Sequence, residues 1–253
     1  SDVCSSDLAR FRLIGSKSPI RRSKAIQPSV SILKPVCGLE KNLYDNLISA
    51  CCQEYDGTYE TIFAVQDRND PAIQVIEQVK AACPQAGILV VIDETPLGAN
   101  GKISNLQNGL AKASGQVIAI SDSDMNLSPD YLTHLVAPLD DPGVGIVCTL
   151  YRARKPDNFM ETLELLTFNT DFTPYLVFAY STGASIVCPG ATMAIRRDVL
   201  DAIGGLMPLR DHFVEDYELA RRAAAKGYRT MLIPYVAEMD IHTCLWLDWW
   251  RRQ

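Results

Sequence analysis

The stretch that decides the fold is residues 115–126, GQVIAISDSDMN. Its apolar run at residues 117–120 predicts a buried β-strand. The run leads directly into two carboxylates that are one residue apart, Asp122 and Asp124. Ligands of open α/β sheets bind beyond the carboxyl ends of the strands, and oxygen ligands suit a hard divalent cation such as Mg²⁺ or Mn²⁺. We therefore predict a site for a metal ion and a phosphorylated substrate at the end of this strand.

The residues before this stretch alternate between strand-like and helix-like patterns. Strands are predicted where short apolar runs end in polar loops, and helices where apolar residues recur every three or four positions. In chain order the segments are a strand at 29–35, a helix at 42–52, a strand at 60–65, a helix at 72–82, a strand at 88–92 and a helix through 103–110. This alternation predicts an α/β fold with a mostly parallel central sheet and helices on both faces.

After Gly143 the alternation is less regular. Strands are predicted at 144–150, 191–195 and 230–233. Helices are predicted from Ser128 toward Leu135, at 159–168, at 197–203, and after Glu215. The uncharged span 172–195 contains Pro174, Gly183, Pro189 and Gly190, so we do not expect it to be a transmembrane helix.

Length and charge restrict the classes of function. A chain of 253 residues can bury one large core or two closely joined halves. The net charge is −6, but residues 1–28 carry +4 and the remaining residues carry −10. The main body is therefore a poor nucleic-acid binder, and no nucleic-acid partner is expected. The eight cysteines form no Cys-x-x-Cys pair, which favours reduced thiols in a cytosolic compartment.

The basic segment at residues 1–28 has no hydrophobic period and predicts a disordered tail. Two interpretations stay open, a solvated terminus and a juxtamembrane segment next to a membrane anchor.

Four acidic positions follow a predicted strand or open a helix: Asp67, Asp93, the pair Asp122 and Asp124, and the pair Glu215 and Asp216. A single carboxylate in such a place is often only a helix cap, and acids at a helix start are favoured by the helix dipole. The Asp-x-Asp pair differs, because its mutual repulsion requires a cation or hydrogen-bond donors. The same letters also fit a phosphotransferase with Asp122 as nucleophile, but such motifs normally open the first strand of a domain, whereas this one ends the fourth.

The loop from Gly98 to Lys102 has two interpretations. Its glycines and lysine would suit a phosphate cradle, in which backbone N–H groups approach an anion. It matches neither of the common nucleotide-binding fingerprints, so a plain connecting turn also remains open.

Several ordered stretches together resemble ceramide glucosyltransferase-like enzymes, a branch of the inverting family 2 glycosyltransferases that includes hopanoid-associated bacterial members. The similarity extends over about residues 29–252. The stretches are residues 31–38 (SILKPVCG), 65–73 (VQDRNDPAI), 100–106 (NGKISNL), the loop containing Asp122, and 215–217 (EDY). The resemblance implies a GT-A fold, the Rossmann-like fold of nucleotide-diphospho-sugar transferases.

The resemblance also assigns separate roles to the acidic residues. It implies that Asp67 lies near the uracil or ribose of a UDP-sugar, and that Asp122 and Asp124 hold the diphosphate through Mg²⁺ or Mn²⁺. It implies that Asp216 is the general base that takes the proton of an acceptor hydroxyl, and that Lys102 assists the donor phosphates.

The activity implied by the resemblance is transfer of a hexose, glucose or N-acetylglucosamine, to a lipid hydroxyl with inversion. Ceramide-, hopanoid- and diacylglycerol-type acceptors all remain open, and the reaction is expected on the cytoplasmic face of a membrane. A degenerate relative that binds the sugar nucleotide without catalysis is the alternative.

The family carries an (Arg/Gln)-x-x-Arg-Trp motif that is expected where this chain reaches Arg251 and Gln253. We therefore expect residues 29–253 to be a GT-A catalytic domain truncated at its C-terminal end, with hydrophobic anchors outside it. Near this end one predicted helix face carries Trp246, Trp249 and Trp250 beside two arginines. That face suits either the headgroup layer of a membrane or packing against the sheet.

Overall fold

A computed structural model describes residues 27–241 of the chain. The predictions for the tail before residue 27 and for the tryptophans and arginines at residues 246–252 lie outside the described residues. The strands are β1 (Val30–Val36), β2 (Tyr59–Val65), β3 (Ile88–Ile92), β4 (Val117–Ser121), β5 (Met125–Asn126), β6 (Val144–Ala153), β7 (Thr192–Arg196) and β8 (Arg229–Met239). The α-helices are α2 (Leu43–Cys51), α3 (Ala72–Ala82), α4 (Gly101–Leu110), α5 (Tyr131–Val136), α6 (Phe159–Thr167), α7 (Thr173–Thr182), α8 (Arg197–Ala202) and α9 (Glu215–Ala225). Shorter helical segments are η1 (Ala137–Asp140), η2 (Phe168–Phe172) and η3 (Met207–Leu209).

The strands form one eight-stranded sheet in the order β3-β2-β1-β4-β7-β6-β8-β5. The four strands from β3 to β4 are parallel, β7 is antiparallel to both of its neighbours, and β6 and β8 are parallel. Parallel pairings thus outnumber antiparallel ones, as the strand–helix alternation predicts. The acidic pair lies where the parallel half of the sheet meets the mixed half.

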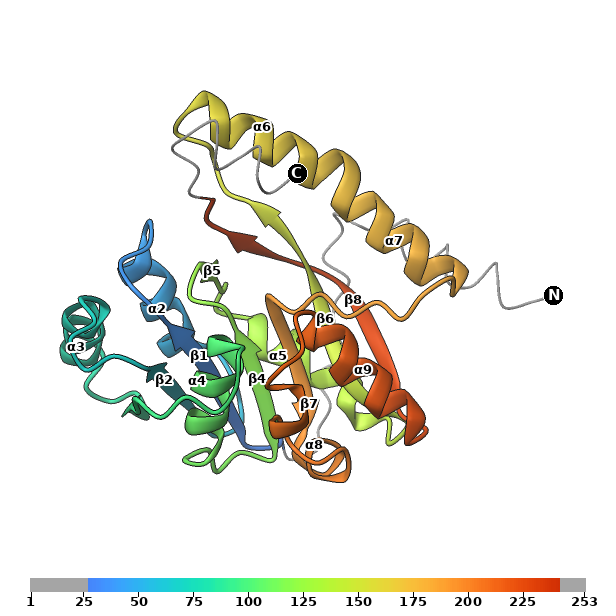
Figure 1. The fold of residues 1–253 in the computed structure, drawn as a ribbon, viewed down its shortest axis with the longest axis horizontal. Helices are drawn as coiled ribbons and strands as arrows, with labels where there is room; N and C mark the ends of the chain where they lie inside the picture. Colours follow the sequence, from blue (N-terminus) through green and yellow to red (C-terminus); the bar gives the residue numbers. More distant parts are fainter. Residues whose placement is uncertain (1–26, 242–253) are drawn as a thin grey trace.

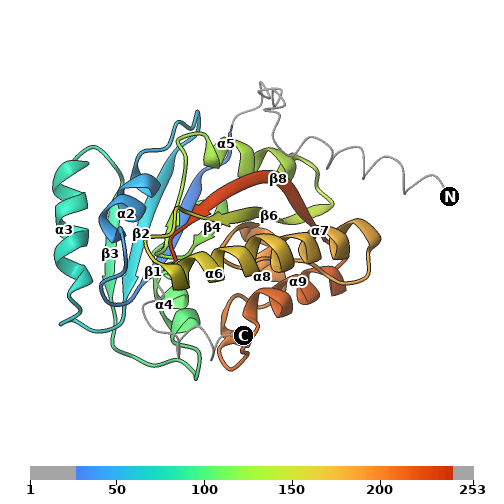
Figure 2. The same cartoon turned by 90° about the horizontal axis from the view of Figure 1, so that it is seen from above.

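Helices cover both faces of this sheet (Figures 1 and 2). Alternation along β1 and β4 separates the two cores, because successive strand residues point to opposite faces. Leu33 and Ile120 pack toward α4, α8 and α9, whereas Ile32 and Ala119 pack toward α5. Helices α2 and α3 cover the latter face over β2, around Phe63. The predicted two-sided α/β architecture is therefore confirmed.

The loop before β4 approaches β1 closely. A Cβ atom on Gly115 would lie 2.4 Å from the backbone nitrogen of Ser31, which no real side chain tolerates. The Gly115 N–H instead donates to the Ser31 hydroxyl at 2.8 Å. This glycine lets β4 enter the sheet beside β1 in the register Val30 to Val117.

The largest difference from the sequence-based prediction is a long helix. The predicted helix at 159–168 is present, but the chain remains helical through η2 and α7 up to Thr182. The prolines and glycines of the uncharged span indicated interruption. Pro174, however, lies in the first turn of α7, where its missing N–H is tolerated, and η2 is a π-helical segment. Within residues 27–241 no helix combines the length and apolarity needed to cross a membrane.

This helix lies over β6 and β8 (Figures 1 and 2). Phe168 and Phe172 stack on each other with ring centroids 4.7 Å apart. Their rings lie 5.2 and 5.8 Å from that of Tyr151 on β6. One side of the helix is therefore attached to the sheet by aromatic contacts, which are worth about 1 kcal/mol each beyond the area they bury.

Strand β8 is longer than predicted, and β5 was not predicted. The sequence pattern ends at Ile233 because Pro234 follows, but a bulge in the β6–β8 pairing accommodates that proline and the strand resumes. The end of β8 then pairs with β5, with Met125 opposite Met239. Helix α5 begins at Tyr131, later than the predicted start near Ser128.

Candidate active site

The acidic pair occupies a tight turn at the carboxyl end of β4. The Met125 N–H donates to the Asp122 carbonyl at 3.1 Å, which closes the turn. The Asp122 N–H donates to the carbonyl of Ala191, before β7, at 2.9 Å. On the other side the Asp240 N–H, just after β8, donates to the Asp124 carbonyl at 2.9 Å. We call residues 122–125 the acidic turn, and it is held between β7 and β8.

A fully buried lysine of β1 lies beneath the acidic turn. The Lys34 ammonium donates to the Asp122 and Met125 carbonyls at 2.8 and 2.9 Å. Burial lowers the pKa of Lys34 to about 8, although Asp124 and Asp122 favour its charged form. In the sequence analysis Lys34 appears only within a family motif and receives no role. A lone cation among the apolar residues of a strand was the signal that could have found it.

Lys102, at the start of α4, joins the acidic turn to α9. Its ammonium lies 2.7 Å from Asp122 Oδ1 and 3.4 Å from Glu215 Oε1. Burial opposes the charge of Lys102, but the two carboxylates outweigh burial and raise its pKa. The proposed phosphate-cradle lysine and one aspartate of the pair are therefore in contact.

The loop before α4 is attached to the segment before α9. The Asn100 side chain accepts from the Ile103 N–H, which caps α4, and donates to the His212 carbonyl at 3.1 Å. The Asn100 N–H donates to the Arg210 carbonyl at 2.9 Å, and the Ala99 N–H to Asp211 at 3.2 Å. This loop is therefore hydrogen-bonded to residues 210–212, which precede α9, in addition to connecting β3 to α4.

Asp216 lies in the first turn of α9, next to Glu215. Its carboxylate accepts from the Tyr217 N–H at 2.7 Å, and the backbone of Gly190 also donates to it. The contact with Gly190 is close, because a Cβ atom there would lie 2.7 Å from Asp216 Oδ2. Burial raises the pKa of Asp216, and the neighbouring Glu215 charge adds to the increase. An aspartate with this shift is better suited to accept a proton than an exposed one.

The acids after β2 and β3 do not join this network within residues 27–241. Asp67 is exposed and its carboxylate accepts from the Asn69 N–H at 2.8 Å, in a local turn. Asp93 accepts from the Thr95 N–H at 2.9 Å in the same way. Asp67 nevertheless lies at the carboxyl end of a central parallel strand, at the same edge of the sheet as the acidic turn.

The acidic turn has the chemistry of a site for a divalent cation. Asp124 Oδ1 is buried and accepts no hydrogen bond from the described residues. Burial, followed by the charge of Asp122, raises the pKa of Asp124 to about 7. Residues 27–241 contain no group of three His, Cys, Asp or Glu side chains suited to one ion. The two carboxylates that could hold a metal here are those of Asp122 and Asp124, and oxygen ligands of this kind suit Mg²⁺ or Mn²⁺ completed by water and phosphate oxygens.

Comparison with solved structures identifies the fold. The chain is similar to the mannosyltransferase PcManGT of Pyrobaculum calidifontis, solved with GDP-Man and Mn²⁺, with 21% identity and a TM-score of 0.72 over 96% of this chain and 66% of that one. It is also similar to glucosyl-3-phosphoglycerate synthase of Mycobacterium tuberculosis, solved with Mn²⁺, UDP and phosphoglyceric acid, with 21% identity and a TM-score of 0.56 over 87% of this chain and 72% of that one. The fold is thus of the GT-A type, as the resemblance implies.

Comparison of sequences gives relatives of one kind. Ceramide glucosyltransferase 1 of Caenorhabditis elegans is 24% identical over 212 residues, which are 83% of this chain and 45% of that protein. Ceramide glucosyltransferase of Gibberella zeae is 30% identical over 198 residues, which are 75% of this chain and 33% of that protein. The chain thus spans less than half the length of these relatives. The family model that matches residues 3–253, nearly the whole chain, is that of glycosyl transferase family 21, and the chain belongs to this family.

Proposed function

We propose that this protein transfers a hexose, glucose or N-acetylglucosamine, from a UDP-sugar to the hydroxyl of a lipid with inversion at the anomeric carbon. The observation that carries the proposal is the contact of Lys102 with both Asp122 of the acidic turn and Glu215, the neighbour of Asp216. Groups suited to a donor diphosphate and a group suited to an acceptor proton are thus adjacent. The relatives named ceramide glucosyltransferases and the neighbours solved with nucleotides and Mn²⁺ support the same reaction.

The donor side consists of the acidic turn and Lys102. Asp122 and Asp124 would hold Mg²⁺ or Mn²⁺, which when bound supplies positive charge to stabilise the departing diphosphate. When the donor binds, Lys102 exchanges its contacts with Asp122 and Glu215 for contacts with the donor phosphates. Lysine commonly binds phosphate groups as a point charge. Asp67, at the end of β2, contacts the uracil or ribose.

The acceptor side consists of Asp216 and the backbone that orients it. The Asp216 carboxylate takes the proton of the acceptor hydroxyl as that oxygen attacks the anomeric carbon from the face opposite to UDP. The N–H groups of Tyr217 and Gly190 hold one orientation of the carboxylate. Its raised pKa makes it a stronger base than an ordinary aspartate.

The outer side of the helix from α6 to α7 supports a lipid acceptor at a membrane surface. Phe159, Leu166 and Phe178 are 70%, 49% and 64% exposed. The chain contains no Lys or Arg between Lys155 and Arg196, so contact through this side would rest on apolar burial. The cysteine usage described above favours the cytoplasmic face of that membrane.

A panel of donors and lipids tests the reaction. UDP-glucose and UDP-N-acetylglucosamine are each offered with ceramide, a hopanoid and diacylglycerol, and UDP release and glycolipid are measured. We expect one donor–lipid pair to give both products and the Asp216→Asn variant to lose at least about 10²-fold in rate with unchanged UDP affinity. Normal turnover by Asp216→Asn would remove the assignment of the base.

The same panel separates the alternatives. A non-catalytic relative would bind UDP and release none from any donor–lipid pair. A phosphotransferase with Asp122 as nucleophile would form a phosphoenzyme, and membership in a glycosyltransferase family favours sugar transfer over that reaction.

Calorimetry tests the metal. UDP binding is expected to strengthen when Mn²⁺ or Mg²⁺ is added, and Asp124→Ala is expected to abolish this increase. UDP binding that is indifferent to both metals and to the substitution would contradict a metal-dependent donor site.

Vesicle sedimentation tests the membrane contact. The double variant Phe159→Ser and Phe178→Ser is expected to bind neutral phospholipid vesicles several-fold more weakly than the unchanged protein, because exposed apolar area is lost. The exposed Tyr44 and Leu89 lie on other elements, and Tyr44→Ser with Leu89→Ser is the matched control. Equal binding by both double variants would assign the contact to another surface.

A further inference from the structure

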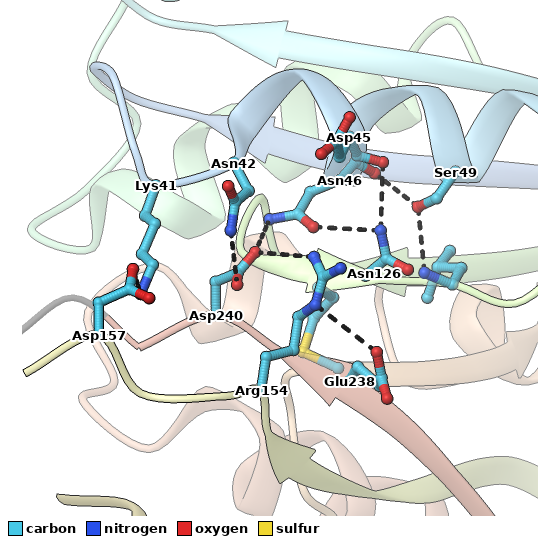
Figure 3. Close-up of polar contacts among 12 residues, drawn as sticks. Lys41, Asn42, Asp45, Asn46, Ser49, Asn126, Arg154, Asp157, Glu238 and Asp240 are labelled. Carbon is cyan, nitrogen blue, oxygen red and sulfur yellow. Dashed lines mark hydrogen bonds and ion pairs between the residues drawn. The ribbon is translucent and has the colours of Figure 1, made fainter. Parts of the chain in front are cut away.

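A buried carboxylate follows β8 and contacts the acidic turn through its backbone. Asp240 is 7% exposed, and its N–H donates to the carbonyl of Asp124 at 2.9 Å. Figure 3 shows its side chain directed toward the start of α2. Asp240 thus joins the acidic turn to a helix about 190 residues earlier in the chain, where Asn46 lies 194 positions away.

Three donors converge on the Asp240 carboxylate. Oδ1 accepts from Asn42 Nδ2 at 3.0 Å, and Oδ2 accepts from Asn46 Nδ2 at 2.8 Å. The Arg154 guanidinium lies 3.4 Å from Oδ2 and supplies an opposite charge. Burial of an ionised carboxylate is costly unless it is paired and hydrogen-bonded, and both conditions are met here.

The contacts continue from Asn46 to the residue after the acidic turn. Because a carboxylate only accepts hydrogen bonds, Asn46 must present its NH₂ group to Asp240 and its Oδ1 to the other side. That oxygen accepts from Asn126 Nδ2 at 3.3 Å, and Asn126 Nδ2 also lies 3.2 Å from the Asp45 carbonyl (Figure 3). Asn126 is the second residue of β5 and directly follows the acidic turn.

The C-terminal side of the acidic turn is therefore held in two ways by the same residue, Asp240. The Asp240 backbone holds the Asp124 carbonyl, and the Asp240 side chain sets the amide orientation that holds Asn126. Among residues 27–241 no group of three His, Cys, Asp or Glu side chains is arranged to hold one ion, so Asp240 does not form such a group with Asp122 and Asp124.

We propose that Asp240 is a positioning residue that keeps Asp122 and Asp124 in the geometry needed to bind a divalent cation. It acts through Asn46 and Asn126 and through its own N–H. This role rests on the proposed function, in which the acidic turn binds a metal ion together with UDP. The carboxylate is needed for its two acceptor oxygens and not for its bulk. Asp240→Asn keeps the shape of the side chain, but its NH₂ group would face the NH₂ group of Asn42 or Asn46, which also donates.

The test measures Mn²⁺ binding to the whole chain in the presence of UDP, from the electron paramagnetic resonance signal of free Mn²⁺. Asp240→Asn is expected to weaken Mn²⁺ binding about 10- to 100-fold, as substitutions behind metal ligands usually do. The thermal midpoint without metal is measured in parallel, and Mn²⁺ is expected to raise it less in the variant than in the unchanged protein.

Asp157→Asn is the matched control. Asp157 is an exposed carboxylate in the same region, 2.6 Å from Lys41 (Figure 3), and its ion pair is with Lys41 and not with a residue of the acidic turn. This control is expected to bind Mn²⁺ as the unchanged protein does. Asn126→Ala is expected to give part of the Asp240→Asn loss, and the double variant to lose less than the sum of the two single losses.

Three outcomes would overturn the inference. They are Mn²⁺ binding by Asp240→Asn within twofold of the unchanged protein, equal weakening by Asp240→Asn and Asp157→Asn, and additive losses in the double variant. A protein that binds Mn²⁺ and UDP but transfers no sugar to any lipid would contradict the proposed function, while weaker Mn²⁺ binding by Asp240→Asn in that same protein would still support the inference.

Discussion

The two halves of the sheet are built in different ways. In the parallel half, β1 pairs with β2 and β2 with β3, so consecutive strands lie side by side with one helix between them. In the mixed half, β4 pairs with β7 and β6 with β8, and each pairing joins segments that are far apart in the chain. Pairing among β1, β2 and β3 therefore joins strands that follow each other in the chain, whereas the β1–β4 pairing and the whole second half depend on long-range contacts. The acidic turn lies at the junction of the two.

This division also separates the chemical roles. Lys34 and Lys102, which contact the acidic turn, come from β1 and α4 of the parallel half. Asp216 and the glycine that packs on it come from the other half. Metal and donor binding should thus be separable from proton removal by substitutions in different halves.

The largest effect is expected from a substitution in the mixed half that displaces Asp216 and leaves the donor site unchanged. In Gly190→Ala the added Cβ atom would lie 2.7 Å from Asp216 Oδ2, so the carboxylate must move. We expect the transfer rate kcat to fall about 10³-fold, or about 4 kcal/mol, with UDP and Mn²⁺ affinity within twofold of normal. Steady-state kinetics and calorimetry measure the two quantities.

Gly109→Ala is the control for this substitution. Gly109 lies in the parallel half, and a Cβ atom added to it would have no neighbour nearer than 3.5 Å. Normal kcat in Gly190→Ala, or a matched loss in Gly109→Ala, would show that the contact with Asp216 does not position the base.

The next largest effect is expected when Lys34, a residue of the parallel half, no longer donates to the acidic turn. Lys34→Met keeps most of the buried volume but removes the ammonium that donates to the Asp122 and Met125 carbonyls, so that the Asp122 carbonyl keeps only the Met125 N–H of these two donors. We expect the free energy of unfolding to fall by about 2–3 kcal/mol, because unsatisfied buried acceptors are costly. Urea denaturation measures this, and Lys112→Met, at an exposed position, is expected to change it by less than about 0.5 kcal/mol. Equal stability of the two variants would contradict a supporting role for Lys34.

A smaller effect tests whether the long helix is independent of the site. Asn158 Oδ1 accepts from the Glu161 N–H at 2.9 Å and caps α6. Asn158→Ala is expected to lower the free energy of unfolding by about 1 kcal/mol without a change in UDP affinity, whereas Asn158→Asp keeps the cap. Thermal unfolding and calorimetry measure both, and a weakened UDP affinity in Asn158→Ala would show that the helix reaches the donor site.

The smallest effect concerns the helix that carries Asp216. Hydrogen bonds from Arg221, followed by those from Arg222, lower the pKa of Glu218 to about 2, although burial opposes the shift. Since the folded value lies below the unfolded value near 4.5, the stabilisation is present above about pH 4.5 and is lost as the pH falls toward 2. Glu218→Gln is expected to be less stable by about 0.5–1 kcal/mol at pH 7, and this difference should shrink between pH 5 and pH 3 in urea titrations. A difference that grew on acidification would contradict the assignment.

The parallel half could be predicted closely because each of its elements carries its own pattern. The helix Ala72–Ala82 and the strand Ile88–Ile92 have the predicted bounds, and β1 and β2 differ from theirs by one residue. The site after β4 could also be predicted, because two carboxylates directly after a buried strand repel each other in any fold and require a cation or hydrogen-bond donors. The roles of Asp67, Asp122, Asp124 and Asp216 stay predictions.

The mixed half could not be predicted to the same degree. The α7 segment lacks a polar face, so helical periodicity cannot reveal it. It continues directly from η2, whose Phe168 and Phe172 contact Tyr151 of the sheet. Strand β5 has only two residues and exists because β8 passes beside it. The continuation of β8 beyond Pro234 depends in turn on β6.

The sequence by itself determined the α/β class, the order of the elements in the parallel half and the position of the acidic pair, because these depend on local hydrophobic periodicity and on charges that are adjacent in the chain. Only the tertiary structure decided which groups surround that pair. Lys34 of β1 and Asp240 after β8 contact the acidic turn directly, and Glu215 of α9 contacts it through Lys102. These contacts join residues that are 88 or more positions apart, and no local pattern records which distant side chains a folded sheet brings together.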